Sequence, residues 1–199
     1  MTPINFESYY WQNDLVRLRA MAEGDWETSY HNRFDSAARF LLQSEMELPP
    51  TVAGEQEAVR QFVGFAPGTG RLMFTIENLA GENVGAFNLN SIDERNGTFS
   101  IGIQIDRRHR GKGYGTAAMR LLLRYAFFER RLHKLNNSVL AGNAASARMF
   151  EKLGAVVEGR RRETVFSGGR YHDEILVGLT REEFEQSEAR LQPDDSRRT

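Results

Sequence analysis

The segment from residue 107 to residue 116, RRHRGKGYGT, has the residue types of a phosphate-binding loop. Its glycines let the backbone approach an anion closely, and its arginines and lysine add positive charge. If the segment opens a helix, the unpaired N–H groups of the first turn and the positive end of the helix dipole also favour an anion. The composition therefore predicts a binding site for a phosphate-bearing cofactor.

The flanking sequence places this segment between a strand and a helix. Upstream, residues 99–105 alternate apolar side chains with small or polar ones, which is the period of a strand with one buried face. Downstream, apolar residues recur at helical spacing from Ala117 to about Arg131. The glycines therefore lie at a predicted helix N-terminus.

The spacing of the glycines separates three kinds of phosphate loop. The dinucleotide-binding pattern G-x-G-x-x-G requires a glycine where Thr116 stands, and the P-loop pattern requires a glycine upstream of Gly111 that the chain lacks. The pattern Arg110-x-x-Gly113-x-Gly115 instead resembles the [Q/R]-x-x-G-x-[G/A] pyrophosphate loop of the GNAT N-acetyltransferase superfamily, which binds coenzyme A. For this segment alone, an ordinary glycine-rich turn is the alternative.

Two further segments support the resemblance. Residues 143–155, NAASARMFEKLGA, resemble the superfamily pattern N-x-x-[SA]-x-x-[LM]-[YF]-E-K-x-G-[FA]. Residues 158–173 are similar to the closing hairpin of the branch that acetylates the N-termini of ribosomal proteins. The similarity covers roughly residues 14–185. It implies an α/β fold (α+β by some schemes), with a mixed, mostly antiparallel sheet of six to seven strands that is splayed in the middle and carries helices on both faces.

The resemblance implies acetyl-CoA as the co-substrate. It assigns the pantetheine arm to the splay, where the arm pairs like an extra strand with the backbone of Ile103 and Ile105. It also assigns a contact with the arm to the Asn143 amide, and Arg148 lies on the same predicted helix, within reach of the cofactor phosphates. The pyrophosphate is expected at Arg110, Gly111, Lys112, Gly113, Tyr114, Gly115 and Thr116.

Acetyl transfer from a thioester requires a proton donor for the departing thiolate. The commonest family pattern has tyrosine at the position of Phe150, which cannot donate a proton. In the ribosomal-protein branch a serine three residues after the asparagine has this role, and Ser146 occupies the matching position. The alternative is that Ser146 only satisfies the first turn of its helix, with Asn143 as the N-cap. The family stabilises the carbonyl oxyanion with a backbone N–H at a bulged strand end, here near residues 103–105.

The resemblance to the same branch also suggests a base that takes a proton from the amine, because that branch uses a glutamate on the penultimate strand. A gap-free alignment from Ser146 puts Val165 at that position, and Glu163 lies two residues earlier, on the same face of a regular strand. Glu163 is therefore the candidate base, and an ion pair with a neighbouring arginine is the alternative role. A water chain would suffice for an N-terminal amine, whose pKa of about 7.7 to 8.0 is well below the 10.4 or so of lysine.

Composition bounds the class of protein. With 199 residues, of which 40% are hydrophobic, the chain is expected to form a single domain over residues 1–192, followed by a disordered tail at 193–199. The net charge of -1 gives no reason to expect a nucleic acid or a membrane as partner. The chain has no cysteine, which excludes an acyl-cysteine route, and its histidines show no metal-ligand spacing, so no metal is expected. No secretory signal is evident in the polar residues 1–14, and a cytoplasmic location is expected.

The remaining sequence predicts an order of elements that agrees with this fold. Thr180 and Glu183 form the pattern of a capping box and predict a final helix. Strands are expected at 15–20, 72–77, 84–90, 98–105, 135–140, 156–166 and 171–179, and helices at 25–48 (one or two), 55–65 and 143–153.

These observations predict an acetyl-CoA-dependent N-acetyltransferase that moves an acetyl group directly to a primary amine, either a protein N-terminus or a small amine. One alternative is a small-molecule acetyltransferase that modifies an antibiotic, a polyamine or an amino-acid-like amine. Another is a coenzyme A-binding protein without catalysis, for which Phe150 and the missing glutamate at Val165 are the evidence. Family members often pair as dimers, so a homodimer is an open expectation.

Overall fold

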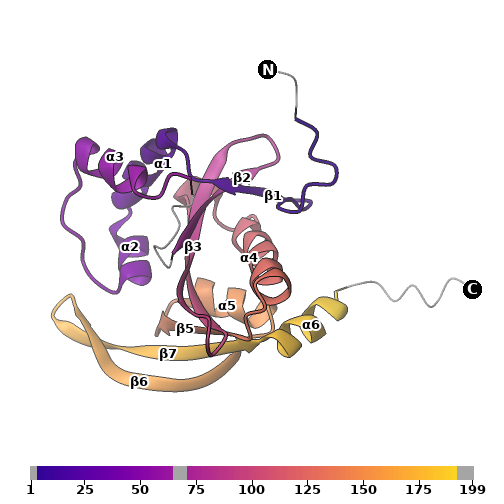
Figure 1. Ribbon diagram of the computed structural model, residues 1–199. Helices are drawn as coiled ribbons and strands as arrows, with labels where there is room; N and C mark the ends of the chain where they lie inside the picture. The colour runs from indigo at the N-terminus through magenta and orange to yellow at the C-terminus, as the bar shows by residue number, and fades with distance from the viewer. Residues whose placement is uncertain (1–3, 65–70, 192–199) are drawn as a thin grey trace, which may run out of the picture.

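The computed structural model describes residues 4–64 and 71–191, which contain one seven-stranded sheet in the order β1-β2-β3-β4-β5-β7-β6 (Figure 1). Neighbouring strands are antiparallel except β4 and β5, which are parallel. The sheet is therefore mixed and mostly antiparallel, as the family resemblance implies. The strands are β1 (Val16–Ala20), β2 (Leu72–Asn78), β3 (Asn83–Asp93), β4 (Thr98–Ile105), β5 (Lys134–Leu140), β6 (Val156–Ser167) and β7 (Arg170–Thr180).

Helices cover both faces of the sheet. Helices α1, α2 and α3 lie on one side of β3, and α4 and α5 lie on the other (Figure 1). The predicted capping box is confirmed, because the Thr180 and Glu183 side chains each bond the other's backbone N–H at the start of α6. The helices are α1 (Trp26–Arg33), α2 (Ser36–Gln43), α3 (Val52–Arg60), α4 (Tyr114–Arg124), α5 (Ala144–Lys152) and α6 (Arg181–Ala189).

The expected elements are present, with two shifts along the chain. The helix expected over 55–65 is α3, which starts earlier because the Thr51 hydroxyl caps it. The long helix after the glycines ends at Arg124 and continues as a wider π-helical turn at Tyr125–Glu129. The last residue of the helix expected over 55–65 and the expected tail at 193–199 lie outside the described residues.

The hydrophobic core lies between the sheet and α4. Alternate strand residues and one face of α4 meet there and are almost completely buried. This packing fixes the positions of β4 and α4, which precede and follow the glycine-rich loop. Its most buried members include Leu18, Ile76, Phe87, Leu89 and Phe99 from the strands and Met119, Leu122 and Leu123 from α4.

Strands β4 and β5 pair only at their first residues. The parallel register joins Thr98 with Lys134 and Phe99 with Leu135, and the strands separate beyond these pairs. On its other side β4 pairs with β3 without interruption over residues 100–105, and β5 pairs with β7 along its whole length. The sheet is therefore splayed, as expected, and we call the space between β4 and β5 beyond the last pair the gap.

The bulge expected near residues 103–105 is not there. The β3–β4 ladder is regular over these residues, and its irregularity lies between Asn90 and Asp93 of β3, where Ser91 has a φ of 50°. Between these pairs two β3 residues face one residue of β4, and the left-handed conformation of Ser91 takes up the extra residue of β3. The expectation of a bulged β4 end is therefore wrong, and β4 is a regular strand along the gap.

Asp25, just before α1, fastens that helix to the sheet through a buried network. Its carboxylate accepts two hydrogen bonds from Arg19, both 2.7 Å, and one each from the Ala22 N–H, the Thr75 hydroxyl and the Asn83 amide, all 2.8 Å. Burial alone would raise the pKa of Asp25, but the hydrogen bonds outweigh it and hold the pKa below its ordinary value. The ionised carboxylate therefore contributes to stability.

Replacing Asp25 by asparagine should lower the free energy of unfolding by about 2 kcal/mol at pH 7. This loss is smaller than the loss on breaking a fully buried ion pair, because Arg19 keeps its contact with Glu77. Because the pKa of Asp25 is lower in the folded protein than in the unfolded chain, where it is about 3.9, the ionised carboxylate stabilises the fold at pH values above that of the unfolded chain. This stabilisation is lost as the pH falls through the pKa of the folded state. The difference between wild type and variant should therefore shrink in urea unfolding at about pH 3. The exposed Glu27→Gln change is the control, and a difference independent of pH would contradict the assignment.

Candidate functional site

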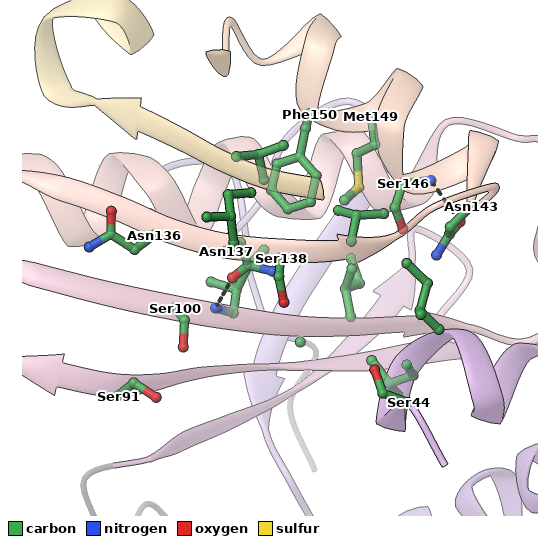
Figure 2. A pocket seen from close by; sticks show the side chains of 18 of the residues that line it. Ser44, Ser91, Ser100, Asn136, Asn137, Ser138, Asn143, Ser146, Met149 and Phe150 are labelled. Carbon is green, nitrogen blue, oxygen red and sulfur yellow. Dashed lines mark hydrogen bonds between the residues drawn. The ribbon is translucent and has the colours of Figure 1, made fainter. Parts of the chain in front are cut away.

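Two cavities meet at the gap. The strand cavity, of about 750 Å³, is bounded by β4, β5, α5 and the end of α2 (Figure 2). The loop cavity, of about 470 Å³, lies between α5, the start of α2 and the phosphate loop, which we define as residues 110–116. A long ligand could therefore extend from the phosphate loop into the gap. The residues that border both cavities are Leu41, Leu42, Ile103, Asn143, Ser146 and Met149.

The phosphate loop offers backbone N–H groups to the loop cavity. Gly111 and Gly113 have φ values of 77° and 85°, which favour glycine, and Gly113 is the N-cap of α4. The Ala117 N–H donates to the Gly113 carbonyl (3.0 Å), so the N–H groups of residues 114–116 precede the first helical bond. His109 borders the same cavity, and its ring Nδ1 is buried without a partner in the described part of the chain. These uncommitted groups fit a pyrophosphate.

The basic residues around the loop differ in what they contact. The Arg110 Nε donates to the Ile105 carbonyl (2.9 Å), and its Nη1 lies 2.8 Å from Asp35 Oδ2 at the start of α2. Arg110 therefore fastens the end of β4 to α2, and its charge is already paired. Arg148 is exposed and borders the loop cavity, whereas Lys112 is exposed and borders neither cavity.

The backbone of β4 directs polar groups into the gap. The Ile101 N–H donates to the side-chain oxygen of Asn137 on β5 (2.9 Å), so it points away from β3. Because N–H directions alternate along an antiparallel strand, the Ile103 N–H also points into the gap. The carbonyl of Ile105, farther along, is taken by Arg110. Ile103 therefore carries the backbone groups that best match the expected pairing with an extended ligand.

Asn143 caps α5 and leaves the Ser146 hydroxyl free. The Asn143 Oδ1 accepts a hydrogen bond from the Ser146 N–H (3.1 Å). The cap therefore uses the backbone of Ser146, and its hydroxyl has no hydrogen-bond partner among the residues that the structure describes. Phe150, one turn further, is 3% exposed and borders the strand cavity with an apolar ring (Figure 2). Ser146 is thus the hydroxyl that α5 supplies to the gap.

Glu163 lies outside both cavities. The β6–β7 register shifts between Arg161 and Val165, and Glu163 sits in this irregular stretch with a φ of 56°. Its N–H donates to Asp173 (2.7 Å), and its side chain is exposed. Because the shift breaks the alternation of the strand, the inference that Glu163 shares a face with Val165 is wrong. A role for Glu163 as the base remains a prediction, and its position does not support it.

Sequence reasoning missed the polar residues that line the strand cavity. The run 136–138 of β5, Asn-Asn-Ser, borders it, and three consecutive polar residues inside a central strand were the available signal. Two charged side chains also border it, and both are paired: Glu158 lies 2.6 Å from the Lys134 Nζ, and Arg161 lies 3.5 Å from Glu174. Within the described residues, the cavity therefore presents neutral amides and hydroxyls and no unpaired carboxylate.

In residues 4–64 and 71–191, no three histidine, cysteine, aspartate or glutamate side chains are placed to hold a metal ion. Over the same ranges, none of the helices is long and apolar enough to cross a membrane.

Comparisons with known proteins bear on this site. A family model described as the acetyltransferase (GNAT) domain matches residues 16–156. The chain is similar to the SPbeta prophage-derived uncharacterized N-acetyltransferase YokL of Bacillus subtilis, with 39% identity over 102 residues, or 51% of this chain and 58% of YokL. It is also similar to YdaF of Bacillus subtilis, whose name assigns it provisionally to ribosomal N-acetylation, with 33% identity over 105 residues, or 53% of this chain and 57% of YdaF.

The chain thus spans little more than half the length of these two relatives. Among solved structures, the spermidine N-acetyltransferase from Vibrio cholerae in complex with CoA and spermine is similar, with a TM-score of 0.76 and 22% identity. The match covers 87% of this chain and 99% of that one, and it shows that the two share a fold.

Proposed function

The chain belongs to the GNAT acetyltransferase family, and we propose that it transfers the acetyl group of acetyl-CoA directly to a primary amine that enters the strand cavity. One observation carries this proposal: the loop cavity, with its free N–H groups, and the strand cavity meet at Ile103 and Ser146. A cofactor with its pyrophosphate at the loop would reach both residues through the gap. The acceptor would approach the same point from the strand cavity.

The loop, Ile103 and Ser146 would each have a distinct chemical role in this reaction. Residues 113–116 would hold the pyrophosphate, and acetyl-CoA would supply the acetyl group as a thioester. The Ile103 N–H would donate to the thioester carbonyl oxygen and stabilise its negative charge. The amine nitrogen forms the new bond to the carbonyl carbon as the C–S bond breaks. Ser146 gives its proton to the sulfur and regains one from water, while the amine releases one to water, so protons balance.

The lining of the strand cavity supports an N-terminal or amino-acid-like amine as the acceptor. Amides and hydroxyls suit the polar, uncharged body of a peptide end, whereas a polyamine carries several positive charges that require carboxylate partners. The carboxylate of Glu158, which borders the cavity, is already paired with Lys134. An N-terminal amine, with a pKa of about 7.7 to 8.0, is also partly neutral near pH 7 and needs no strong base.

A panel of acceptors tests the proposal. Release of coenzyme A thiol from acetyl-CoA should be followed with peptides of different N-terminal residues, spermidine and an aminoglycoside, and the product confirmed by mass spectrometry. We expect kcat/KM for the best peptide to exceed that for spermidine by roughly 100-fold, because a site without free carboxylates lacks partners for the additional charges. A preference for spermidine would overturn the acceptor assignment. Coenzyme A binding without release to any acceptor would overturn the catalytic one.

A further inference from the structure

Asn137 ends the ladder between β4 and β5. The last parallel pairs join Thr98 with Lys134 and Phe99 with Leu135, so the same register would bring Ile101 opposite Asn137. At that point the Ile101 N–H bonds the Asn137 side-chain oxygen (2.9 Å) instead of a backbone carbonyl. The side chain therefore spans the separating strands and fixes where the gap begins (Figure 2).

This bond also fixes the orientation of the Asn137 amide. A backbone N–H can bond only the oxygen of an amide, so the NH₂ group must occupy the other position. Asn137 is half-buried and borders the strand cavity, and its NH₂ has no partner among the described residues. In Figure 2 the Asn137 nitrogen lies on the side of its oxygen nearer to Ser146. The closed end of the gap therefore carries a free hydrogen-bond donor.

Two neighbouring hydroxyls at this end are already committed. The Ser138 hydroxyl donates to Glu174 (2.8 Å), and the Ser100 hydroxyl donates to Asn90. A ligand carbonyl that reaches the end of the gap would therefore meet two free donors, the Ile103 N–H and the Asn137 NH₂. Two converging donors at one carbonyl oxygen are the arrangement that stabilises a developing oxyanion.

We infer that Asn137 is a second oxyanion donor, whose NH₂ bonds the acyl carbonyl of the thioester while its oxygen holds the gap open through Ile101. This inference rests on the proposed function, because it assumes that an acyl thioester occupies the gap. The amide separates the two tasks: its oxygen is structural and its nitrogen contacts the substrate.

Aspartate at this position keeps the structural oxygen and exchanges the donor NH₂ for a second acceptor oxygen. Asn137→Asp keeps an acceptor for the Ile101 N–H and removes the NH₂, so it should fold with a wild-type thermal midpoint and bind free coenzyme A normally. We expect kcat to fall about 100-fold, as for loss of one oxyanion donor, and the affinity for acetyl-CoA to fall relative to that for coenzyme A. Asn5→Asp makes the same change at an exposed position outside both cavities, where the side-chain oxygen likewise accepts a backbone N–H, that of Glu7, and it should match wild type. An Asn137→Asp variant with wild-type kcat and acetyl-CoA affinity would overturn the inference.

A measurement on the wild-type protein does not depend on how the variant folds. The Asn137 side-chain NH₂ resonances in a ¹⁵N–¹H spectrum should shift when acetyl-CoA is added without an acceptor and should shift much less with coenzyme A. Equal spectra with the two ligands would overturn the inference even if the enzyme is active. Absence of coenzyme A binding to wild type would instead count against the proposed function, so the two failures are distinguishable.

Discussion

Replacing Gly113 by valine should weaken coenzyme A binding about 1,000-fold, measured by isothermal titration calorimetry. Gly113 has a φ of 85°, which a β-branched residue rarely adopts, and an added Cβ would lie 3.5 Å from the Leu15 side chain. The backbone of the phosphate loop must therefore shift, and the N–H groups of residues 114–116 lose their common direction. A hydrogen bond to a charged group contributes about 1.5–3 kcal/mol, so the loss of two such bonds gives about 3–6 kcal/mol, a range that includes a 1,000-fold effect.

Gly81 provides a matched control for backbone strain. It lies in the turn between β2 and β3 with a φ of 83°, and an added Cβ would meet nothing within 4 Å. Gly81→Val should therefore lower the free energy of unfolding through the same backbone conformation and leave coenzyme A affinity unchanged. If Gly113→Val binds coenzyme A as tightly as wild type, the phosphate loop is not the binding site.

The conformation of residues 99–124, a strand, a glycine-rich loop and a helix, could be predicted from the sequence because its determinants are local. The glycines, the preceding strand and the following helix lie within some 30 consecutive residues, and their spacing sets the geometry. The splay between β4 and β5 was also predicted, through the family resemblance. The position of Arg110 was not, because its partner Asp35 is distant in sequence and belongs to α2. The motif identified Arg110 as a basic residue of the loop but did not indicate which acidic residue would pair with it.

The strand cavity depends on contacts between distant segments. The bond from Ile101 to Asn137 joins residues 36 positions apart, and no local pattern predicts it. The prediction that Glu163 shares a strand face with Val165 was wrong for a different reason. Counting by two along β6 assumes a regular strand, but the register shift between Arg161 and Val165 removes the alternation. The family resemblance predicted the hairpin, whereas the irregularity in its register could be seen only in the structure.

Replacing Ser146 by alanine should lower kcat about 1,000-fold, within the range that a positioned proton donor contributes. The Ser146 hydroxyl is free and borders both cavities, and neither Phe150 nor Met149 beside it can donate a proton. Because the Asn143 cap bonds the Ser146 backbone N–H, alanine keeps the cap and the helix. The affinity for coenzyme A and the thermal midpoint should therefore remain those of wild type. Steady-state thiol release and calorimetry measure the two effects separately.

Two further variants separate proton donation from a general polar role. Ser138→Ala removes a hydroxyl that borders the same strand cavity but already bonds Glu174, so its kcat should stay close to wild type. Phe150→Tyr in the Ser146→Ala background places a phenol where the common family pattern has one, and it should restore part of the lost rate. A Ser146→Ala enzyme with wild-type kcat would show that the thiolate leaves without a donor on α5. Equal decreases of kcat in Ser146→Ala and Ser138→Ala would show that the decrease comes from the lower polarity of the cavity and not from the loss of a proton donor.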